Sequence, residues 1–198
     1  MRPLIHLDLK VRDDLLPRFC LLTGGGFTVG AGTGGSLRDL LCEQLGIPPD
    51  YLEKRIQTIF LNGKAVDDAQ IATVEPGSTI ALSAAMPGIA GAMFRKGSVY
   101  APMRSQISHG HRKADRLVDS QGRVVIKLFN AVQAELGPLL LSRGIQIPGR
   151  ALARLFRGRP QTFCSGILAA RIDDAPISPH DLLEKDWEGQ DVVLSIGL

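Results

Sequence analysis

Cysteine and aromatic residues are both scarce in this chain of 198 residues, and their scarcity argues against several classes of protein. The three cysteines, Cys20, Cys42 and Cys164, are odd in number and never occur in C-x-x-C spacing. This pattern argues against a disulfide framework and against a zinc ribbon, and it favours a reducing cytoplasm. Aromatic residues make up 5% of the chain, so few side chains could stack on single-stranded bases.

The N-terminal region also lacks the apolar core of a secretory leader, because His6, Asp8 and Lys10 interrupt its apolar residues. No charged residue occurs from Pro76 through Phe94, but the Ser, Thr, Gly and Pro content of that stretch opposes a membrane-spanning helix. We therefore expect a cytoplasmic protein without membrane contact.

The remaining composition is that of a globular protein. Hydrophobic residues make up 44% of the chain and charged residues 22%, and the net charge is +3. A chain of this length can bury one ordinary core or two small ones. The charge is too small to demand a nucleic-acid partner.

The first half of the chain contains signals for four strands and one helix. Apolar and polar residues alternate from Ile5 to Val11, and a second strand is predicted at Phe27–Val29. Ser36 and Asp39 have the spacing of a capping box, which predicts the start of a helix at Ser36. Gly46 can adopt the left-handed backbone conformation that ends this helix. Beyond it, the turn Asn62–Gly63 follows an apolar run, and a last strand is predicted at residues 78–82.

The second half repeats this order with little sequence identity. Strands are predicted at residues 124–129, 145–147 and 167–172, and Asp173–Asp174 stands where the first half has Asn62–Gly63. Leu152, Leu155 and Phe156 form the apolar face of a helix that ends at Gly158. A last strand at residues 189–195 completes an internal duplication of a strand–strand–helix–strand–strand unit.

This order is that of a β-grasp unit, and two segments resemble the small sulfur-carrier proteins, namely the small subunit of molybdopterin synthase and the thiamine sulfur carrier. The segment VVIKLFNAVQAELG at 124–137 resembles their opening, and LNGKAVDDAQIATVEPGSTIALSAAMPGIAG at 61–91 resembles their second half. The resemblance implies an α+β fold of two tandem β-grasp (ubiquitin-like) domains, each a mixed sheet crossed by one helix. We expect the first domain at 1–92, a connecting arm at 93–121 and the second domain at 122–198.

The chemistry that the resemblance implies needs a C-terminal Gly-Gly, because the tail must thread a narrow channel in an activating enzyme. This chain ends with Gly197 and Leu198 instead. A sulfur-carrier relative of molybdopterin or thiamine biosynthesis is therefore kept as an alternative rather than as the main interpretation.

A literal G-x-G-x-x-G occurs at Gly30–Gly35, before the predicted helix. A dinucleotide site also needs an acidic residue after the next strand, where this chain has Asn62–Gly63. The paired acids Asp13–Asp14, Asp67–Asp68 and Asp173–Asp174 all fall at predicted turns, which favour Asp for reasons unrelated to catalysis. We expect no catalytic, cofactor-binding or metal-binding residues.

The arm is both apolar and basic. The run RIQTIFLNGKAVDDAQIATVEPGSTIAL at 55–82 resembles the β portion of an S4-type RNA-binding domain. Together with the basic residues of the arm, this resemblance implies an S4-like RNA-binding protein as a second alternative, with RNA as the partner. The apolar residues of the arm favour burial against the second domain or against another copy of the chain. We expect a non-catalytic binding or scaffold protein that acts through a protein partner or a homo-oligomer, with the contact made by Met86, Ile89, Phe94, Tyr100, Arg95, Lys96 and Arg104.

Overall fold

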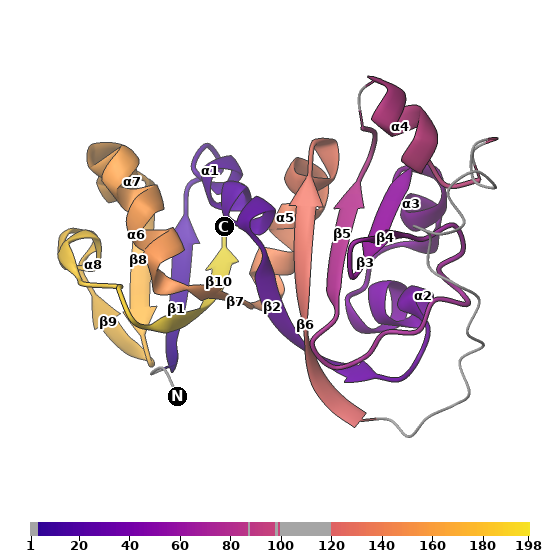
Figure 1. The fold of residues 1–198 in the computed structure, drawn as a ribbon. Helices are drawn as coiled ribbons and strands as arrows, with labels where there is room; N and C mark the ends of the chain where they lie inside the picture. Colours follow the sequence, from indigo (N-terminus) through magenta and orange to yellow (C-terminus); the bar gives the residue numbers. More distant parts are fainter. Residues whose placement is uncertain (1–3, 87, 98, 100–119) are drawn as a thin grey trace. The chain divides into compact units, whose positions relative to one another are not determined.

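The computed structural model describes residues 4–86, 88–97, 99 and 120–198, and it confirms the α+β class. The chain forms two compact units (Figure 1). Unit 1 combines Met1–Phe27 with Ala134–Leu198, and unit 2 is Thr28–Gln133. Among the described residues, no helix is long and apolar enough to cross a membrane.

The strands form one ten-stranded mixed sheet, to which unit 1 contributes five strands in the order β7-β10-β1-β8-β9. The central strand β1 pairs in parallel with β10 and antiparallel with β8, and β10 pairs antiparallel with β7. The strands of this unit are β1 (Leu4–Val11), β7 (Ile145–Pro148), β8 (Ile167–Ile172), β9 (Ala175–Ile177) and β10 (Asp191–Gly197). Its helices are α1 (Leu16–Cys20), the 3-10 helix η1 (Leu21–Gly25), α6 (Gly149–Gly158), α7 (Pro160–Gly166) and α8 (Pro179–Glu184).

The core of unit 1 forms on one face of this sheet. Leu7, Leu9 and Val11 of β1 are buried, as the alternating pattern predicts, and α6 buries Leu152 and Phe156. Phe19, Phe156 and Phe163 meet edge-to-face, with ring centroids 5.2–6.3 Å apart. Such aromatic pairs add roughly 0.5–1.5 kcal/mol each beyond their burial, so this cluster fixes α1, α6 and α7 together.

Unit 2 also contains five strands, in the order β4-β3-β5-β6-β2. The strand β5 pairs antiparallel with β3 and in parallel with β6. The strands of this unit are β2 (Phe27–Thr33), β3 (Thr58–Leu61), β4 (Lys64–Ala65), β5 (Thr79–Ser83) and β6 (Ser120–Phe129). Its helices are α2 (Leu37–Asp39), the π-helix η2 (Leu40–Gln44), α3 (Pro49–Lys54) and α4 (Gly88–Phe94), while the chain passes into unit 1 within α5 (Ala131–Arg143).

The predicted capping signals of the first-half helix are confirmed. The Ser36 side chain accepts a hydrogen bond from the Asp39 N–H, and Gly46 has a φ of 67° at the stop. Leu37, Leu40 and Leu41 are buried, so the predicted apolar face is the one that packs. Most of the helix is a π-helix, a form that the sequence pattern did not predict.

Both predicted two-residue turns form hairpins with left-handed backbone. Asn62 and Gly63 have φ of 51° and 77°, and they join β3 to β4. Asp173 and Asp174 have φ of 47° and 67°, and they join β8 to β9. Positive φ at both central residues suits the twist of a two-residue hairpin. The correspondence between the two halves therefore extends to turn geometry.

The two halves exchange their first strands. β1, from the first half, lies between β10 and β8 of the second half, whereas β6, from the second half, lies between β5 and β2 of the first half (Figure 1). The compact units consequently divide near residues 27 and 133, not at the expected boundaries of 92 and 122. Either first strand offers one apolar face and parallel pairing, so both strands satisfy the same position in a sheet.

The exchange predicts which fragment folds. A chain of residues 27–133 holds all five strands of unit 2, and we expect it to unfold cooperatively in urea. A chain of residues 1–92 lacks β6 from the middle of that sheet, and we expect no cooperative transition and no dispersed amide spectrum. If the chain of residues 1–92 unfolded cooperatively and the chain of residues 27–133 were unstructured, the exchange of strands would be contradicted. The domain boundaries expected from the sequence, at 92 and 122, would then be supported.

Gly149, the first residue of α6, supports a second prediction about stability. A Cβ atom at this position would lie 2.1 Å from the Trp187 carbonyl oxygen, which is backbone and cannot move alone. Gly149→Ala should therefore lower the free energy of unfolding by about 1–3 kcal/mol in urea titrations. Gly158→Ala, at the other end of α6, meets open space and should be neutral or stabilising by roughly 0.5–1 kcal/mol. Equal effects of the two changes would contradict the close approach.

Candidate functional site

One face of the sheet in unit 2 carries exposed aromatic side chains. The β-ladder places Phe60, Ala81 and Lys127 in one row across β3, β5 and β6. Phe129 lies two residues beyond Lys127, so its side chain projects from the same face, and it is 41% exposed. The opposite face holds the buried residues Ile80, Leu82, Val124, Ile126 and Leu128.

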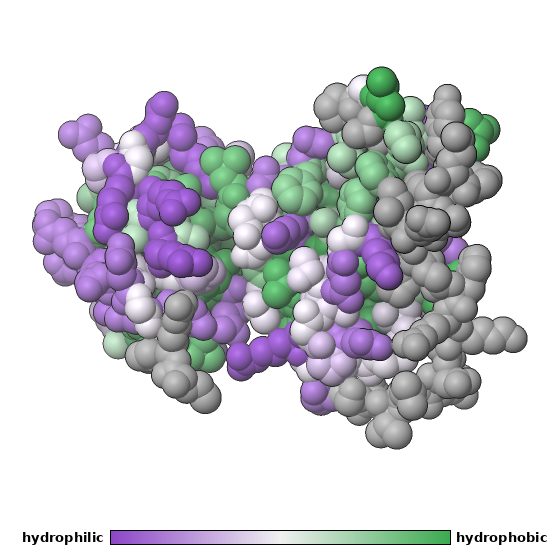
Figure 2. Space-filling model, viewed as in Figure 1, coloured by the Kyte–Doolittle hydropathy of each residue, from purple (hydrophilic) through white to green (hydrophobic). Residues whose placement is uncertain are grey.

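Helix α4 adds to this face. The Phe94 ring lies against the Phe60 ring, with centroids 5.3 Å apart. Ile89, five residues before Phe94 on the same helix, is 81% exposed. Figure 2 shows apolar residues gathered over the part of unit 2 that carries α4. We name Phe60, Ile89, Phe94 and Phe129 the aromatic face.

The chain around α4 is compact and is fastened to unit 2 by hydrogen bonds. Gly91 is buried, and a Cβ atom there would overlap the carbonyl group of Met86, just before the helix. The Lys96 N–H donates to the Gln57 carbonyl at 2.8 Å, and the Lys96 ammonium donates to the Leu52 carbonyl at 2.7 Å. Partial burial lowers the pKa of Lys96. These bonds hold α4, and with it the α4 residues of the aromatic face, in a defined position on unit 2.

The expected partner-binding residues are placed as follows. Phe94 and Ile89 belong to the aromatic face, Met86 is half-buried, and Arg95 is exposed. Lys96, expected to contact a partner, donates to the Leu52 carbonyl within unit 2. Tyr100 and Arg104 lie outside the described residues, as do residues 98 and 100–119 of the predicted arm, whereas its last residues begin β6 (Ser120–Phe129). Residues 88–91, which belong to the segment that resembles the sulfur carriers, lie in helix α4 (Gly88–Phe94).

Sequence analysis missed Phe60, Phe129 and Lys127 as members of this face. The signal was present in the alternation of residues 124–129, where Val124, Ile126 and Leu128 face the core. The intervening residues had to project from the other side. Nothing in the sequence showed that Phe60 would lie close to Phe94, because that contact depends on how α4 packs.

The glycine run Gly30–Gly35 is used by strand β2 and its connection to α2. Gln44 bonds both backbone groups of Gly32, and Gly34 N–H donates to the Val74 carbonyl at 2.7 Å. At the start of α2, the N–H groups of Leu37 and Arg38 donate to the Ala72 and Ala69 carbonyls. The backbone donors that a phosphate would use are thus already bonded within unit 2.

A small pocket of about 340 Å³ in unit 1 is lined by His6, Asp8, Asp173 and Asp174. Its polar groups serve the fold: the His6 N–H donates to the Asp173 carboxylate at 2.9 Å, and Asp8 accepts a bond from the Ser195 hydroxyl. In the described part of the chain, no group of three His, Cys, Asp or Glu residues could hold a metal ion. The paired acids Asp173–Asp174 form the predicted turn.

The cysteines differ in burial, which predicts their reactivity. Burial raises the pKa of Cys20 to about 11 and also raises the pKa of Cys42, whereas Cys164 is exposed. Because the thiolate is the nucleophile, about one Cys20 side chain in a thousand would be reactive at pH 8 even if reagent could reach it. Iodoacetamide at pH 8 should modify Cys164 first, and Cys20 and Cys42 only after denaturant is added, as measured by peptide mass spectrometry. Native modification of Cys20 at the rate of Cys164 would contradict the buried environment.

Comparison of the chain with family models, with curated proteins and with solved structures finds no match. The candidate site therefore has to be interpreted from its own geometry.

Proposed function

We propose that this chain is a non-catalytic binding protein of β-grasp type, and that it recognises a protein partner through the aromatic face of unit 2. The observation that carries the proposal is the packed Phe60–Phe94 pair on the sheet face where Phe129 is 41% exposed, together with the 81% exposed Ile89 of the helix that carries Phe94. Aromatic side chains supply a large apolar contact area at low cost in conformational entropy, which makes them effective centres of protein interfaces.

Charge at the aromatic face favours a different protein over a second copy of this chain. Lys127 projects from the same row as Phe60, and a two-fold contact centred there would bring two ammonium groups together. Like charges placed opposite one another in an interface cost binding energy. The partner that fits best presents apolar side chains to the aromatic face and a carboxylate opposite Lys127.

The support of α4 favours a preorganised binding surface. α4 is held to unit 2 by the Phe60–Phe94 ring contact and by the two Lys96 bonds directly after the helix, so the apolar side chains are already positioned before a partner binds. A preorganised surface loses less conformational entropy on association.

The test uses affinity capture from the source organism, followed by titration of the purified captured protein in a calorimeter. Ile89→Asp combined with Phe129→Ser should weaken binding at least tenfold, equivalent to about 1.4 kcal/mol, because both changes remove apolar contact. Lys127→Glu should weaken binding and increase repulsion of the partner's carboxylate. Thermal unfolding of each variant verifies that the fold is kept.

The matched control is Leu168→Asp, which removes a side chain of β8 in unit 1 that is 63% exposed. It should leave the affinity unchanged. Unchanged binding by the Ile89/Phe129 variant, or a wild-type protein that sediments as a dimer and becomes a monomer in that variant, would refute a separate protein partner at this face.

A further inference from the structure

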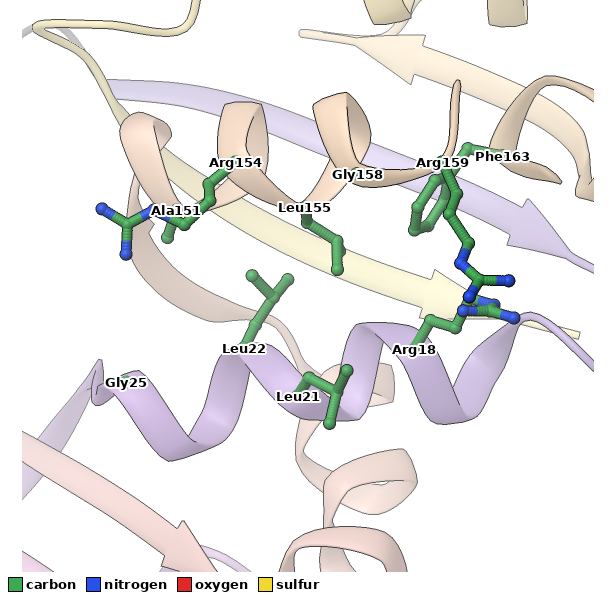
Figure 3. Close-up of a pocket in the computed structure, with 10 residues that line it drawn as sticks. All are labelled: Arg18, Leu21, Leu22, Gly25, Ala151, Arg154, Leu155, Gly158, Arg159 and Phe163. Atoms are coloured by element: carbon green, nitrogen blue, oxygen red, sulfur yellow. The ribbon is translucent and has the colours of Figure 1, made fainter. Parts of the chain in front are cut away.

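Unit 1 contains a groove of about 430 Å³ between α1–η1 on one side and α6–α7 on the other. Leu21 and Leu22 of η1 face Leu155 of α6 across it, and Phe163 of α7 closes one end (Figure 3). Its elements all belong to unit 1, and it shares no residue with the aromatic face.

The floor of the groove is apolar and well supported. Leu22 and Phe163 are buried, and Phe163 packs edge-to-face on Phe19 and Phe156. The side walls of the groove are accessible to a ligand, because Leu21 is 60% exposed and Leu155 is half-buried. A fixed floor below exposed leucines is typical of grooves that accept the apolar face of a helix.

Three arginines line the groove, and no acidic residue does. Arg18 and Arg159 extend toward one end, and Arg154 lies toward the other (Figure 3). Among the described residues, none of these three guanidinium groups has a carboxylate within salt-bridge distance, whereas Arg157 on the same helix pairs with Glu188 at 3.6 Å. The groove therefore presents positive charge that is not held in a salt bridge at both ends of an apolar floor.

This distribution of charge selects the occupant. A fatty acid carries its charge at one end, and it would use Arg154 or the Arg18–Arg159 pair but not both. Arg154 and Arg159 are five residues apart on α6 and its C-terminal cap, which is about 7–8 Å along a helix. A partner helix of roughly two turns, with carboxylates at both ends of an apolar stripe, would satisfy both ends together.

We propose that the groove lined by Arg18, Arg154 and Arg159 binds an acidic amphipathic helix of another protein. Leucine-sized side chains at i, i+3 and i+4 of that helix pack on Leu21, Leu22 and Leu155. Its flanking carboxylates pair with Arg154 at one end and with Arg18 and Arg159 at the other.

The test measures fluorescence anisotropy of a labelled peptide titrated with the full chain. The peptide has about 14 residues, with leucines at i, i+3, i+4 and i+7 and glutamates on both sides of that stripe. We expect saturable binding that weakens as salt is raised, because the arginines and the glutamates attract through screened charges. A peptide with glutamine in place of every glutamate should bind at least tenfold more weakly.

Variants of the groove separate its charge from its apolar floor. Arg154→Gln alone, and Arg18→Gln with Arg159→Gln, should each reduce the peptide affinity about tenfold. Leu21→Glu places a negative charge on an exposed position, where it repels the glutamates of the peptide. This variant should abolish binding without unfolding the protein, as verified by its melting temperature. Arg157→Gln is the matched control on the same helix, and it should leave the affinity unchanged.

Three results would each overturn the proposal. The first is no saturable binding of the glutamate peptide to the wild-type chain. The second is equal loss of affinity in Arg157→Gln and Arg154→Gln, which would indicate a general effect of charge. The third is saturable binding of dodecanoate, dependent on Arg18 and Arg159 alone, without binding of the peptide.

Discussion

The parallel pairing of β1 with β10 is the constraint on which the rest of unit 1 depends. It joins residues as far apart as Asp8 and Ser195, which are 187 positions apart in the chain. Because β1 also pairs with β8, removing it would leave β8 and β9 separated from β10 and β7. The strand pairing of unit 1 can therefore be completed only when nearly the whole chain is present. Pairing over such distances is slow to form, since the loop must close before any contact contributes.

Unit 2 differs from unit 1 because its five strands come from one continuous segment of the chain. Its strand β6 lies between β5 and β2, is the last of the five along the chain, and pairs in parallel with β5. Asn130, directly after β6, donates to the Ser83 hydroxyl at 3.0 Å and to the Ala85 carbonyl at 2.7 Å. These bonds fasten the end of β6 to the chain that leads into α4. The strand that completes the sheet thus also anchors the segment that carries the aromatic face.

Local elements of this fold could be predicted from the sequence because their causes are local. The alternation from Ile5 to Val11 gave a strand with one buried side, and Asn62–Gly63 gave a hairpin with positive φ at both residues. Ser36 capped its helix because a hydroxyl at that position can accept from the third N–H beyond it. These signals need only neighbouring residues to act.

The exchange of first strands could not be predicted, because β1 and β6 carry equivalent patterns. Leu7, Leu9 and Val11 in one strand correspond to Val124, Ile126 and Leu128 in the other, so burial alone does not assign either to a half. Helix α5 was also missed. It contains Pro138, which normally ends a helix, and Gly137, whose lack of a side chain allows Cys20 to approach. The reason for that glycine lies in a contact more than a hundred residues away, and the arginine-lined groove is assembled from segments equally distant.

The two candidate surfaces have one physical property in common: basic side chains accompany exposed apolar ones. Exposed leucine, isoleucine and phenylalanine side chains favour association, and uncompensated positive charge beside them opposes contact between identical copies. Lys127 has this effect at the aromatic face, and Arg18, Arg154 and Arg159 have it at the groove. Self-association is thereby disfavoured at the same positions where an acidic partner gains charge-assisted hydrogen bonds. If both surfaces bind partners as we propose, positive charge beside the apolar area would favour partners that carry carboxylates.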